Sequence, residues 1–272
     1  MRILSLGAGV QSSCIALMSE KGFIEKIDCA IFADTMNEPK SVYVWLEKLK
    51  GMVSFPVYVV SKGDLMLEAT TIRNSKKNIG KQYVRPLLPA FLLQPDGKKG
   101  LMGRRCTGEF KIVPVHRKIK ELLGIKRATK NNTKKADLLI GISTDEAHRI
   151  KSSQVNYADN VYPLIDLNMT RTQCLKWLSS NGYPEPPRSS CSACPFHGDK
   201  EWKRLKDSEP DDFAKAIEIE KKLQEAVNGK GLSGVPYLHG SCKPLGTIDF
   251  SSKKGYQQLD LFGNECEGLC GV

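Results

Sequence analysis

Cysteine is the residue type whose number and spacing in this chain point most directly to chemistry. The chain carries nine cysteines, and two of them form the pair Cys191-x-x-Cys194, followed by Pro195. A CxxC pair can place two thiolates on one metal, and many cysteines in a cytosolic chain indicate metal or redox chemistry rather than a disulfide framework. The pair alone leaves zinc, an iron–sulfur cluster and a redox-active dithiol open. A zinc site would need further ligands, which Cys266 and Cys270 could supply as a CxxxC pair.

A glycine-containing turn at the start of the chain is the second candidate site. Arg2–Leu6 is a short apolar run typical of a buried strand, and the apolar residues after Gly9 follow helical spacing. Gly7 and Gly9 permit a turn that approaches a ligand closely, and the start of the helix directs N–H groups at an anion such as a phosphate. Ser12 and Ser13 could add hydroxyl donors. The same residues also fit an ordinary tight turn, because neither the GxGxxG nor the GxxxxGK[ST] motif is complete.

Further apolar runs predict a repeated strand–helix pattern that would position these residues. Strands are expected at 27–33, 55–60 and 136–141, and loops over 64–114, where the periodicity weakens. Strands alternating with helices are typical of a doubly wound parallel sheet, so the predicted fold class is α/β. A helix after the second strand has an inward face formed by Val42, Trp45, Leu46 and Leu49.

The charge of the chain is strongly uneven. The formal net charge is +11, yet the segment 73–135 alone holds 18 Lys or Arg against three Asp or Glu, a net charge of +15. A field of this sign attracts a nucleic acid or a highly phosphorylated small molecule. A solvated basic loop without a partner explains the same composition. No apolar run is long enough for a transmembrane helix and the first strand begins at once, so we expect no membrane contact and a cytoplasmic location.

Taken in order, these features resemble the sulfonucleotide (PAPS and APS) reductases of the adenine nucleotide α-hydrolase superfamily. The sequence GAGVQS at 7–12 is similar to the superfamily's pyrophosphate loop, SGGxDS, in the reductase variant where glutamine replaces the aspartate. Asp34-Thr35 resembles the start of the reductases' DTG segment, and 141–149 resembles their segment with a glutamate and a late arginine. The resemblance implies an adenine nucleotide, ATP, APS or PAPS. The implied contacts come from Ser5, Gly7, Gly9, Gln11, Ser12, Ser13, Asp34, Thr35, Lys111, Gly141, Glu146 and Arg149.

The same resemblance assigns roles to the cysteines. Segment 104–116 resembles the CC…K..P segment of APS reductases, and the tail 265–272 resembles their C-terminal ECG(L/I)H, whose cysteine attacks the sulfonucleotide. The first likeness implies a 4Fe–4S cluster. Its implied ligands are Cys106, Cys191, Cys194 and Cys266. Alternatives to the last are Cys242, Cys270 or a position left open for an exogenous sulfur. The second likeness makes Cys266 and Cys270 the catalytic candidates.

Three functions fit the sequence. The first is a PAPS/APS reductase-like oxidoreductase with a thioredoxin-like reductant as partner, which Gly7 and Gln11 favour because they depart from the ATP-hydrolysing loop. The second is an ATP-dependent sulfur transferase acting on tRNA or DNA, favoured by the basic segment 73–135. The third is a non-catalytic nucleotide-sensing protein. We expect a nucleotide-binding α/β domain over 1–183 and a CxxC-containing helical region with a cysteine-rich tail over 184–272, packed on the same domain.

Overall fold

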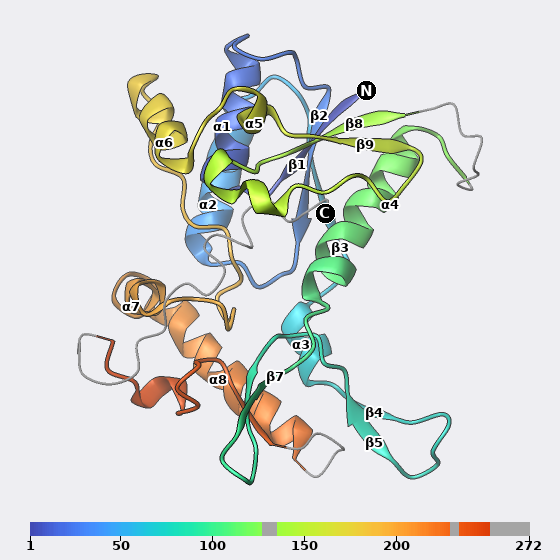
Figure 1. Ribbon diagram of the computed structural model, residues 1–272, viewed down its shortest axis with the longest axis vertical. Coiled ribbons are helices and arrows are strands. Elements are labelled where there is room, and N and C mark those ends of the chain that lie inside the picture. The colour runs from blue at the N-terminus through green and yellow to red at the C-terminus, as the bar shows by residue number, and fades with distance from the viewer. Residues whose placement is uncertain (127–134, 229–233, 251–272) are drawn as a thin grey trace. The chain divides into compact units, whose positions relative to one another are not determined.

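The structure of the protein is a computed structural model that describes residues 1–126, 135–228 and 234–250 (Figure 1). The chain forms two compact units whose segments alternate along the sequence. The described residues within 1–63 and 107–190 form unit 1, and those within 64–106 and 191–250 form unit 2. The sequence predicts one boundary, between 183 and 184, whereas the structure changes unit at 190–191 and also groups 64–106 with the later segment.

Unit 1 is built on a five-stranded sheet. Its strands are β1 (Arg2–Leu6), β2 (Cys29–Asp34), β3 (Val57–Ser61), β8 (Ala136–Ile140) and β9 (Ala158–Val161). They lie in the order β3-β2-β1-β8-β9, and every neighbouring pair is parallel. The parallel α/β class expected from the sequence is therefore confirmed, with β9 as an additional strand. Because the chain adds β2 and β3 on one side of β1 and β8 and β9 on the other, the switch point where such sheets bind ligands lies between β1 and β8.

Helices cover both faces of this sheet. They are α1 (Val10–Glu20), α2 (Lys40–Lys50), α4 (Val113–Leu122), α5 (Pro163–Asp166) and α6 (Arg171–Ser180). Successive strand residues point to opposite faces, so Leu4 and Leu6 of β1 pack with α1, α2 and α6, whereas Ile3 packs with α4. Figure 1 shows α1 and α2 on one side of the strands and α4 on the other. The buried residues of α2 are the four that helical spacing predicts: Val42, Trp45, Leu46 and Leu49.

Unit 2 contains short strands and two longer helices. Its elements are α3 (Leu65–Thr70), β4 (Ile72–Asn74), β5 (Gln82–Val84), β6 (Phe91–Leu93), β7 (Lys99–Leu101), α7 (Asp199–Ser208), α8 (Pro210–Val227) and β10 (Val235–Tyr237). Strands β10, β6 and β7 form one antiparallel sheet, and β4 and β5 form a hairpin. The loops expected over 64–114 are therefore wrong in part, because strands of three residues are too short to show a period of two.

The core of unit 2 joins these short strands to α8. It contains Val84, Ala90, Leu92 and Met102 from the first segment and Leu223, Ala226 and Val227 from the second. Glu220 of α8 holds the later loop, since its carboxylate accepts hydrogen bonds from the amides of Leu238 (2.8 Å) and Leu245 (2.7 Å). In the described part of the chain, no helix combines the length and the apolar composition that crossing a membrane requires.

Candidate functional site

The turn between β1 and α1 contains a left-handed residue, but that residue is not one of its glycines. Ala8 has a φ of 58°, whereas Gly9, the N-cap of α1, is extended with φ −94° and ψ −172°. The left-handed conformation costs a non-glycine residue about 1–2 kcal/mol, so the surrounding structure must hold Ala8 in place. Gly9 gives no side-chain cap, and the first turn of α1 has no acidic residue. Nothing within α1 therefore neutralises the positive end of its dipole, which suits an anion.

The serines of this turn are engaged in the fold. Ser12 Oγ accepts a hydrogen bond from the Gly7 amide (3.2 Å), which closes the turn. Ser13 Oγ accepts one from Trp45 Nε1 (2.9 Å), which fixes α2 against α1. Both serines are buried, as is Ser5 in β1. A phosphate bound here would rely on backbone N–H groups, and hydroxyl contacts from the three serines stay predictions.

A buried polar network joins the turn to the segment that follows β8. Gln11 Nε2 donates to Glu146 Oε2 at 3.1 Å and lies 3.4 Å from Ser143 Oγ. Arg149 Nη1 donates to Glu146 Oε1 at 2.7 Å. The exposed fractions of Gln11, Glu146 and Arg149 are only 1%, 7% and 6%. Three residues that the sequence assigns to the nucleotide thus come together at the switch point, in the paired and hydrogen-bonded form that buried charge requires.

Gln11 suits this network better than an acidic residue would. Its amide nitrogen donates to Glu146, whereas a carboxylate there would place a second negative charge beside the first and disfavour ionisation of both. Its amide oxygen, Oε1, is buried and has no hydrogen-bond partner among the described residues. A buried acceptor left unsatisfied costs about 1–3 kcal/mol. A ligand N–H or O–H that reached Oε1 would restore that hydrogen bond.

Gly141, directly after β8, lies where close approach requires a glycine. A Cβ at this position would lie 2.9 Å from the Ser12 amide nitrogen and 3.2 Å from the Ser12 Cα. These are backbone atoms, which cannot rotate away as a side chain can. The absence of a side chain at Gly141 therefore lets the end of β8 contact the start of α1, and its predicted contact with the nucleotide stays a prediction.

A second group of predicted residues begins at the end of β2. Asp34 Oδ1 accepts hydrogen bonds from the Met36 amide (2.7 Å) and from the Tyr43 hydroxyl (2.8 Å). Burial of Tyr43, together with this hydrogen bond, raises the pKa of its phenol. The phenol therefore stays protonated and donates a hydrogen bond to the carboxylate. Asp34 thereby orders the turn between β2 and α2.

Thr35 and Lys111 meet at Glu38, a residue that the sequence analysis missed. Thr35 Oγ1 donates to Glu38 Oε1 at 3.2 Å, and Lys111 Nζ lies 3.4 Å from the same oxygen. All three side chains are buried. The one sequence feature that could indicate Glu38 is its position, three residues after Thr35 in the loop that leads to α2. This ion pair fixes Lys111, from the π-helical turn Thr107–Ile112, against the loop after β2.

Asp145 and His148 also follow β8 in sequence, and neither belongs to the buried network. Both are exposed. Asp145 Oδ1 accepts a hydrogen bond from the Arg171 amide (3.1 Å) at the start of α6. Asp145 therefore helps to cap that helix, together with the capping box formed by Thr170 and Gln173.

Three of the predicted metal ligands lie in unit 2. Cys191 and Cys194 are buried in a turn in which the Cys194 amide donates to the Cys191 carbonyl (2.9 Å), and Cys106 is half-buried. His197 Nε2 lies 3.0 Å from the same carbonyl oxygen. Across the described residues, no three His, Cys, Asp or Glu side chains are arranged as ligands of one metal ion. The tail with Cys266 and Cys270 lies outside the described residues.

Cys242 lies beside His239, a buried histidine that orders the loop before this cysteine. No sequence pattern indicates His239. His239 Nε2 lies 2.9 Å from Asp199 Oδ1 at the start of α7, and Nδ1 lies 2.8 Å from Ser241 Oγ. Burial lowers the pKa of His239 in spite of the carboxylate beside it, so the ring is neutral at pH 7. Burial also raises the pKa of the Cys242 thiol, an effect that Lys99 opposes. The group therefore fixes the loop and keeps the thiol protonated.

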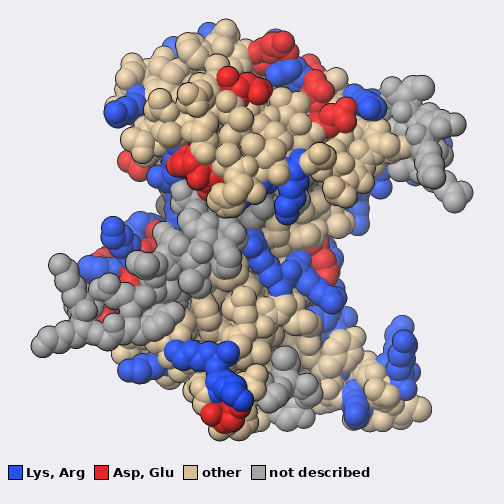
Figure 2. Space-filling model, in the orientation of Figure 1, with Lys and Arg blue, Asp and Glu red and all other residues tan. Residues whose placement is uncertain are grey.

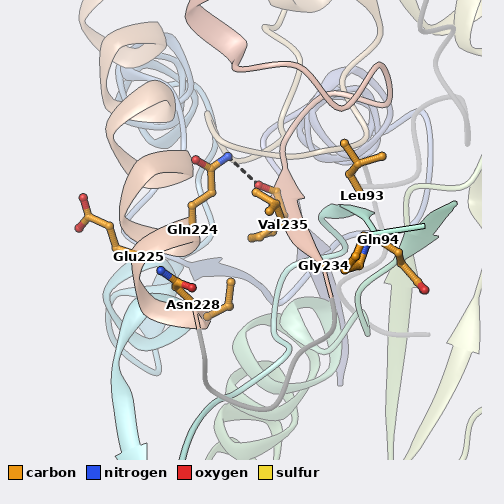
Figure 3. A pocket seen from close by; sticks show the side chains of 10 residues that line it. Leu93, Gln94, Gln224, Glu225, Asn228, Gly234 and Val235 are labelled. Atoms are coloured by element: carbon orange, nitrogen blue, oxygen red, sulfur yellow. Dashed lines mark hydrogen bonds between the residues drawn. The ribbon is translucent and has the colours of Figure 1, made fainter. Parts of the chain in front are cut away.

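Unit 2 also has a groove of about 630 Å³ between β6, β10 and the last turn of α8 (Figure 3). Its wall includes a hydrogen bond from Gln224 Nε2 to the Pro236 carbonyl (2.9 Å). Of the described residues that line it, only Glu225 is charged and none is cysteine or histidine. The described lining holds no nucleophile and no pair of titratable groups, so we do not assign the candidate site to this groove.

Comparisons with known proteins find little similarity. No protein-family model matches the chain, and no curated protein matches it. Among solved structures, the phosphoadenylyl-sulfate (PAPS) reductase from Candida auris, in a phosphate complex, has 14% sequence identity and a TM-score of 0.40, with 68% of this chain and 75% of that chain covered. This likeness is too low to carry an argument about function. The fold class rests on the parallel sheet, and the function must be inferred from the residues of the site.

Proposed function

We propose that the chain binds the phosphate groups of an adenine nucleotide at the carboxyl ends of β1 and β8 and acts on activated sulfur as a sulfonucleotide reductase-like enzyme. The observation that carries the proposal is the buried Gln11–Glu146–Arg149 network. It joins two segments 135 positions apart in sequence, both of which resemble nucleotide-contacting segments of that family. The start of α1, beside it, supplies N–H groups for an anion.

The residues of this site bind and orient the nucleotide. Arg149, held by Glu146, contributes positive charge at the end of β8, and Gln11 Oε1 offers an acceptor to the ligand. Lys111, held by Glu38, contributes a second cation near the end of β2. Because both cations are fixed by buried carboxylates, little reorganisation would accompany binding.

In the reductase reaction the nucleophile comes from the tail. A thiolate of Cys266 or Cys270 attacks the sulfur of APS or PAPS, the bond from sulfur to the phosphate oxygen breaks, and AMP or its 3′-phosphate leaves with the electron pair. A thioredoxin-like dithiol then attacks the cysteine sulfur of the resulting S-sulfocysteine and releases sulfite. The second thiol of that partner closes a disulfide, so the partner supplies both electrons. What supports this assignment is the resemblance of 265–272 to the reductase tail.

A 4Fe–4S cluster stays a prediction, and no step above depends on it. The described donors are not gathered as ligands of one metal ion. Its support is the CxxC pattern together with two contacts that tie neighbouring segments of unit 2. The Arg104 guanidinium lies 5.2 Å from the centre of the Phe196 ring, and Asp199 pairs with His239. Iron, sulfide and zinc analysis of anaerobically purified protein decides between a cluster, zinc and neither.

An ATP-dependent sulfur transferase acting on tRNA or DNA is the second candidate, and charge favours it. The basic segment 73–135 divides between the units, with nine Lys or Arg against one acidic residue in 73–106 and nine against two in 107–135. Both units therefore carry an excess of positive charge. Such an enzyme would activate a base carbonyl with ATP and release pyrophosphate. The third candidate, a nucleotide sensor, would bind without turnover.

Calorimetric titration with APS, PAPS and ATP tests the site, with sulfite and pyrophosphate release measured in parallel. Arg149→Gln should weaken nucleotide binding about tenfold to a hundredfold, the effect of losing a charged hydrogen bond. Arg149→Lys should recover part of the affinity. Arg117→Gln, an exposed arginine of α4 in the same unit, is the matched control and should bind normally.

The products separate the candidates. Sulfite from APS or PAPS supports the reductase, and pyrophosphate from ATP supports the transferase. Tight binding without either product supports the sensor. If none of the three nucleotides binds a folded protein, the nucleotide site itself is refuted.

A further inference from the structure

The β4–β5 hairpin of unit 2 concentrates unpaired positive charge. The stretch 69–95, which contains the hairpin, has no Asp or Glu. Lys76, Lys77 and Lys81 lie at its tip, and all three are exposed. None of them forms an ion pair with a described residue. Figure 2 shows basic side chains at this end of unit 2 without acidic ones beside them.

Several other exposed lysines of unit 2 are paired with a carboxylate. Lys98 lies 2.9 Å from Asp96, Lys203 lies 2.7 Å from Asp207, and Lys222 lies 2.6 Å from Glu218. These pairs leave little net field at the surface. The hairpin tip differs from these paired positions, because its three charges lie within six residues, have no carboxylate of a described residue beside them and add.

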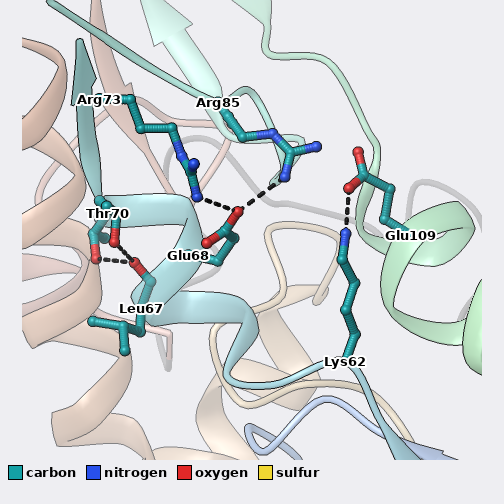
Figure 4. A network of polar contacts seen from close by, with 8 residues as sticks. Lys62, Leu67, Glu68, Thr70, Arg73, Arg85 and Glu109 are labelled. Carbon is teal, nitrogen blue, oxygen red and sulfur yellow. Dashed lines mark hydrogen bonds and ion pairs between the residues drawn. The ribbon is translucent and has the colours of Figure 1, made fainter.

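The base of the hairpin is held firmly (Figure 4). Glu68 of α3 accepts hydrogen bonds from Arg73 Nη2 (2.6 Å) in β4 and Arg85 Nη1 (2.9 Å) just after β5. Burial opposes ionisation of Glu68, but the two guanidinium groups outweigh it and hold the pKa of the carboxyl below its usual range. Val84 is buried in the core of unit 2. An isolated hairpin is marginal in water, so these contacts explain why this one forms.

The tip is an ordered turn. The Ser75 amide donates to the Lys81 carbonyl (2.8 Å), the Lys81 amide to the Asn78 carbonyl (3.0 Å), and the Asn78 amide to Ser75 Oγ (3.0 Å). Gly80 takes the left-handed conformation, with φ 82°. Ile79 is 98% exposed at this turn. The protein thus presents three lysines on a preformed two-stranded ribbon.

We propose that this hairpin is a docking element for double-stranded nucleic acid, with Lys76, Lys77 and Lys81 contacting the phosphate backbone. A two-stranded ribbon fits the major groove of a DNA duplex, and lysines along it would release condensed counterions from the phosphates. Asn74 and Gln82, paired across the strands, add side chains that can hydrogen-bond to base edges or sugars. This goes beyond the proposed function, because a sulfonucleotide is too small to need such a surface.

The composition of the hairpin favours a duplex over the other anionic partners. Single-stranded nucleic acid is bound by stacking on several aromatic rings, and the hairpin has only Tyr83. Insertion into a membrane surface needs a sizeable apolar face, whereas Ile79 lies between polar and basic neighbours at the tip. A duplex needs neither.

The test is binding of a short DNA duplex, an RNA stem of equal length and phosphatidylserine vesicles, across a series of salt concentrations. The hairpin variant replaces Lys76, Lys77 and Lys81 with glutamine. The matched control replaces Lys203, Lys221 and Lys222, exposed lysines of α7 and α8, and so removes the same charge from the same unit. The hairpin variant should bind duplex on the order of tenfold to a hundredfold more weakly, and the slope of log K against log salt should fall by about 2 to 3.

The proposal is supported if the control variant retains duplex binding and the hairpin variant loses it. The duplex that binds more tightly, DNA or RNA, is then identified as the partner. Equal loss in both variants, no duplex binding by the intact protein, or binding to vesicles alone would overturn it. Circular dichroism shows whether the variants stay folded. Sulfite release from APS or PAPS, measured on the same variants, separates failure of this proposal from failure of the proposed function.

Discussion

The buried network of unit 1 and the hairpin of unit 2 use charge in opposite ways. Glu146 and Arg149 are almost fully buried and paired with each other, whereas Lys76, Lys77 and Lys81 are exposed and pair with no described carboxylate. A charge removed from water is costly unless it is matched, so the network fixes where its charges lie. Solvated lysines need no partner and add to a field at the surface. A positioned site and an attracting surface therefore differ both in burial and in whether their charges are paired.

The largest effect should come from breaking the buried pair. Glu146→Leu removes the carboxylate beside Arg149, whose side chain is 5% exposed, and should lower the free energy of unfolding by about 3–5 kcal/mol. Glu218→Leu is the control, because Glu218 pairs with Lys222 at side-chain exposures of 62% and 57% and should change stability little. Urea denaturation measures both. Equal losses would contradict the contrast between buried and exposed charge.

Filling the contact between β8 and α1 should have the next largest effect. Gly141→Ala places a Cβ 2.9 Å from the Ser12 amide nitrogen and should cost about 1–3 kcal/mol through overpacking, with weaker nucleotide binding. Gly108→Ala is the control, since a Cβ there meets no other atom within 4 Å. Thermal unfolding with nucleotide titration checks both variants. An unchanged Gly141→Ala protein would show that the end of β8 can move away from the turn without loss.

Changing the charge but not the size of Gln11 tests the contrast between buried and exposed charge more finely. Gln11→Glu sets a second carboxylate beside Glu146 and should raise the pKa of the carboxyl pair, at about 1.4 kcal/mol for each pKa unit. A carboxyl group whose pKa is raised by folding contributes stability at low pH that is lost as pH rises. The free energy of unfolding of the variant should therefore be lower than that of the original protein at pH 7 and should approach it near pH 5. Gln154→Glu, on an exposed loop, should show no such dependence. Denaturation at both pH values distinguishes them.

The smallest effect concerns two histidines, one in each unit. Burial and Lys120 lower the pKa of His116, and burial lowers that of His239, so both rings are neutral in the folded protein at pH 7. The unfolded chain takes up these protons near pH 6.5, so the free energy of unfolding should fall as pH drops below about 6.5. NMR titration of His116→Gln and His239→Gln assigns each signal. A histidine titrating above 6.5 would refute its burial.

Apolar spacing predicts the elements whose burial pattern is strong. The first strand begins and ends as predicted, and the four inward residues of α2 are all buried. Apolar spacing does not predict strand β9, because its middle residues, Asp159 and Asn160, are polar and the strand lies at the edge of the sheet. The turn after β1 is predicted, but its left-handed residue is Ala8, since the tertiary contacts there override the preference for glycine.

The site is predictable only in part, because its partners are distant in sequence. Resemblance singles out Gln11, Glu146 and Arg149, and the structure joins them. Glu38 and His239 are single residues without a local pattern, and their roles depend on Lys111 and Asp199, which lie far along the chain. Spacing describes neighbours on one element, so contacts between distant elements require the fold itself.

The alternation of the two units has a consequence for synthesis. Val84, Leu92 and Met102 emerge from the ribosome early, yet their partners Leu223, Ala226 and Val227 belong to a helix made only after 107–190. At ordinary elongation rates that intervening stretch takes roughly 4–17 s, during which this apolar cluster has no cover. A nascent chain that stalls before the end of α8 would present the cluster to other chains, so a chaperone would have most effect in this interval. Nor can unit 2 be obtained as one continuous fragment, because either half alone lacks the side chains that complete its core.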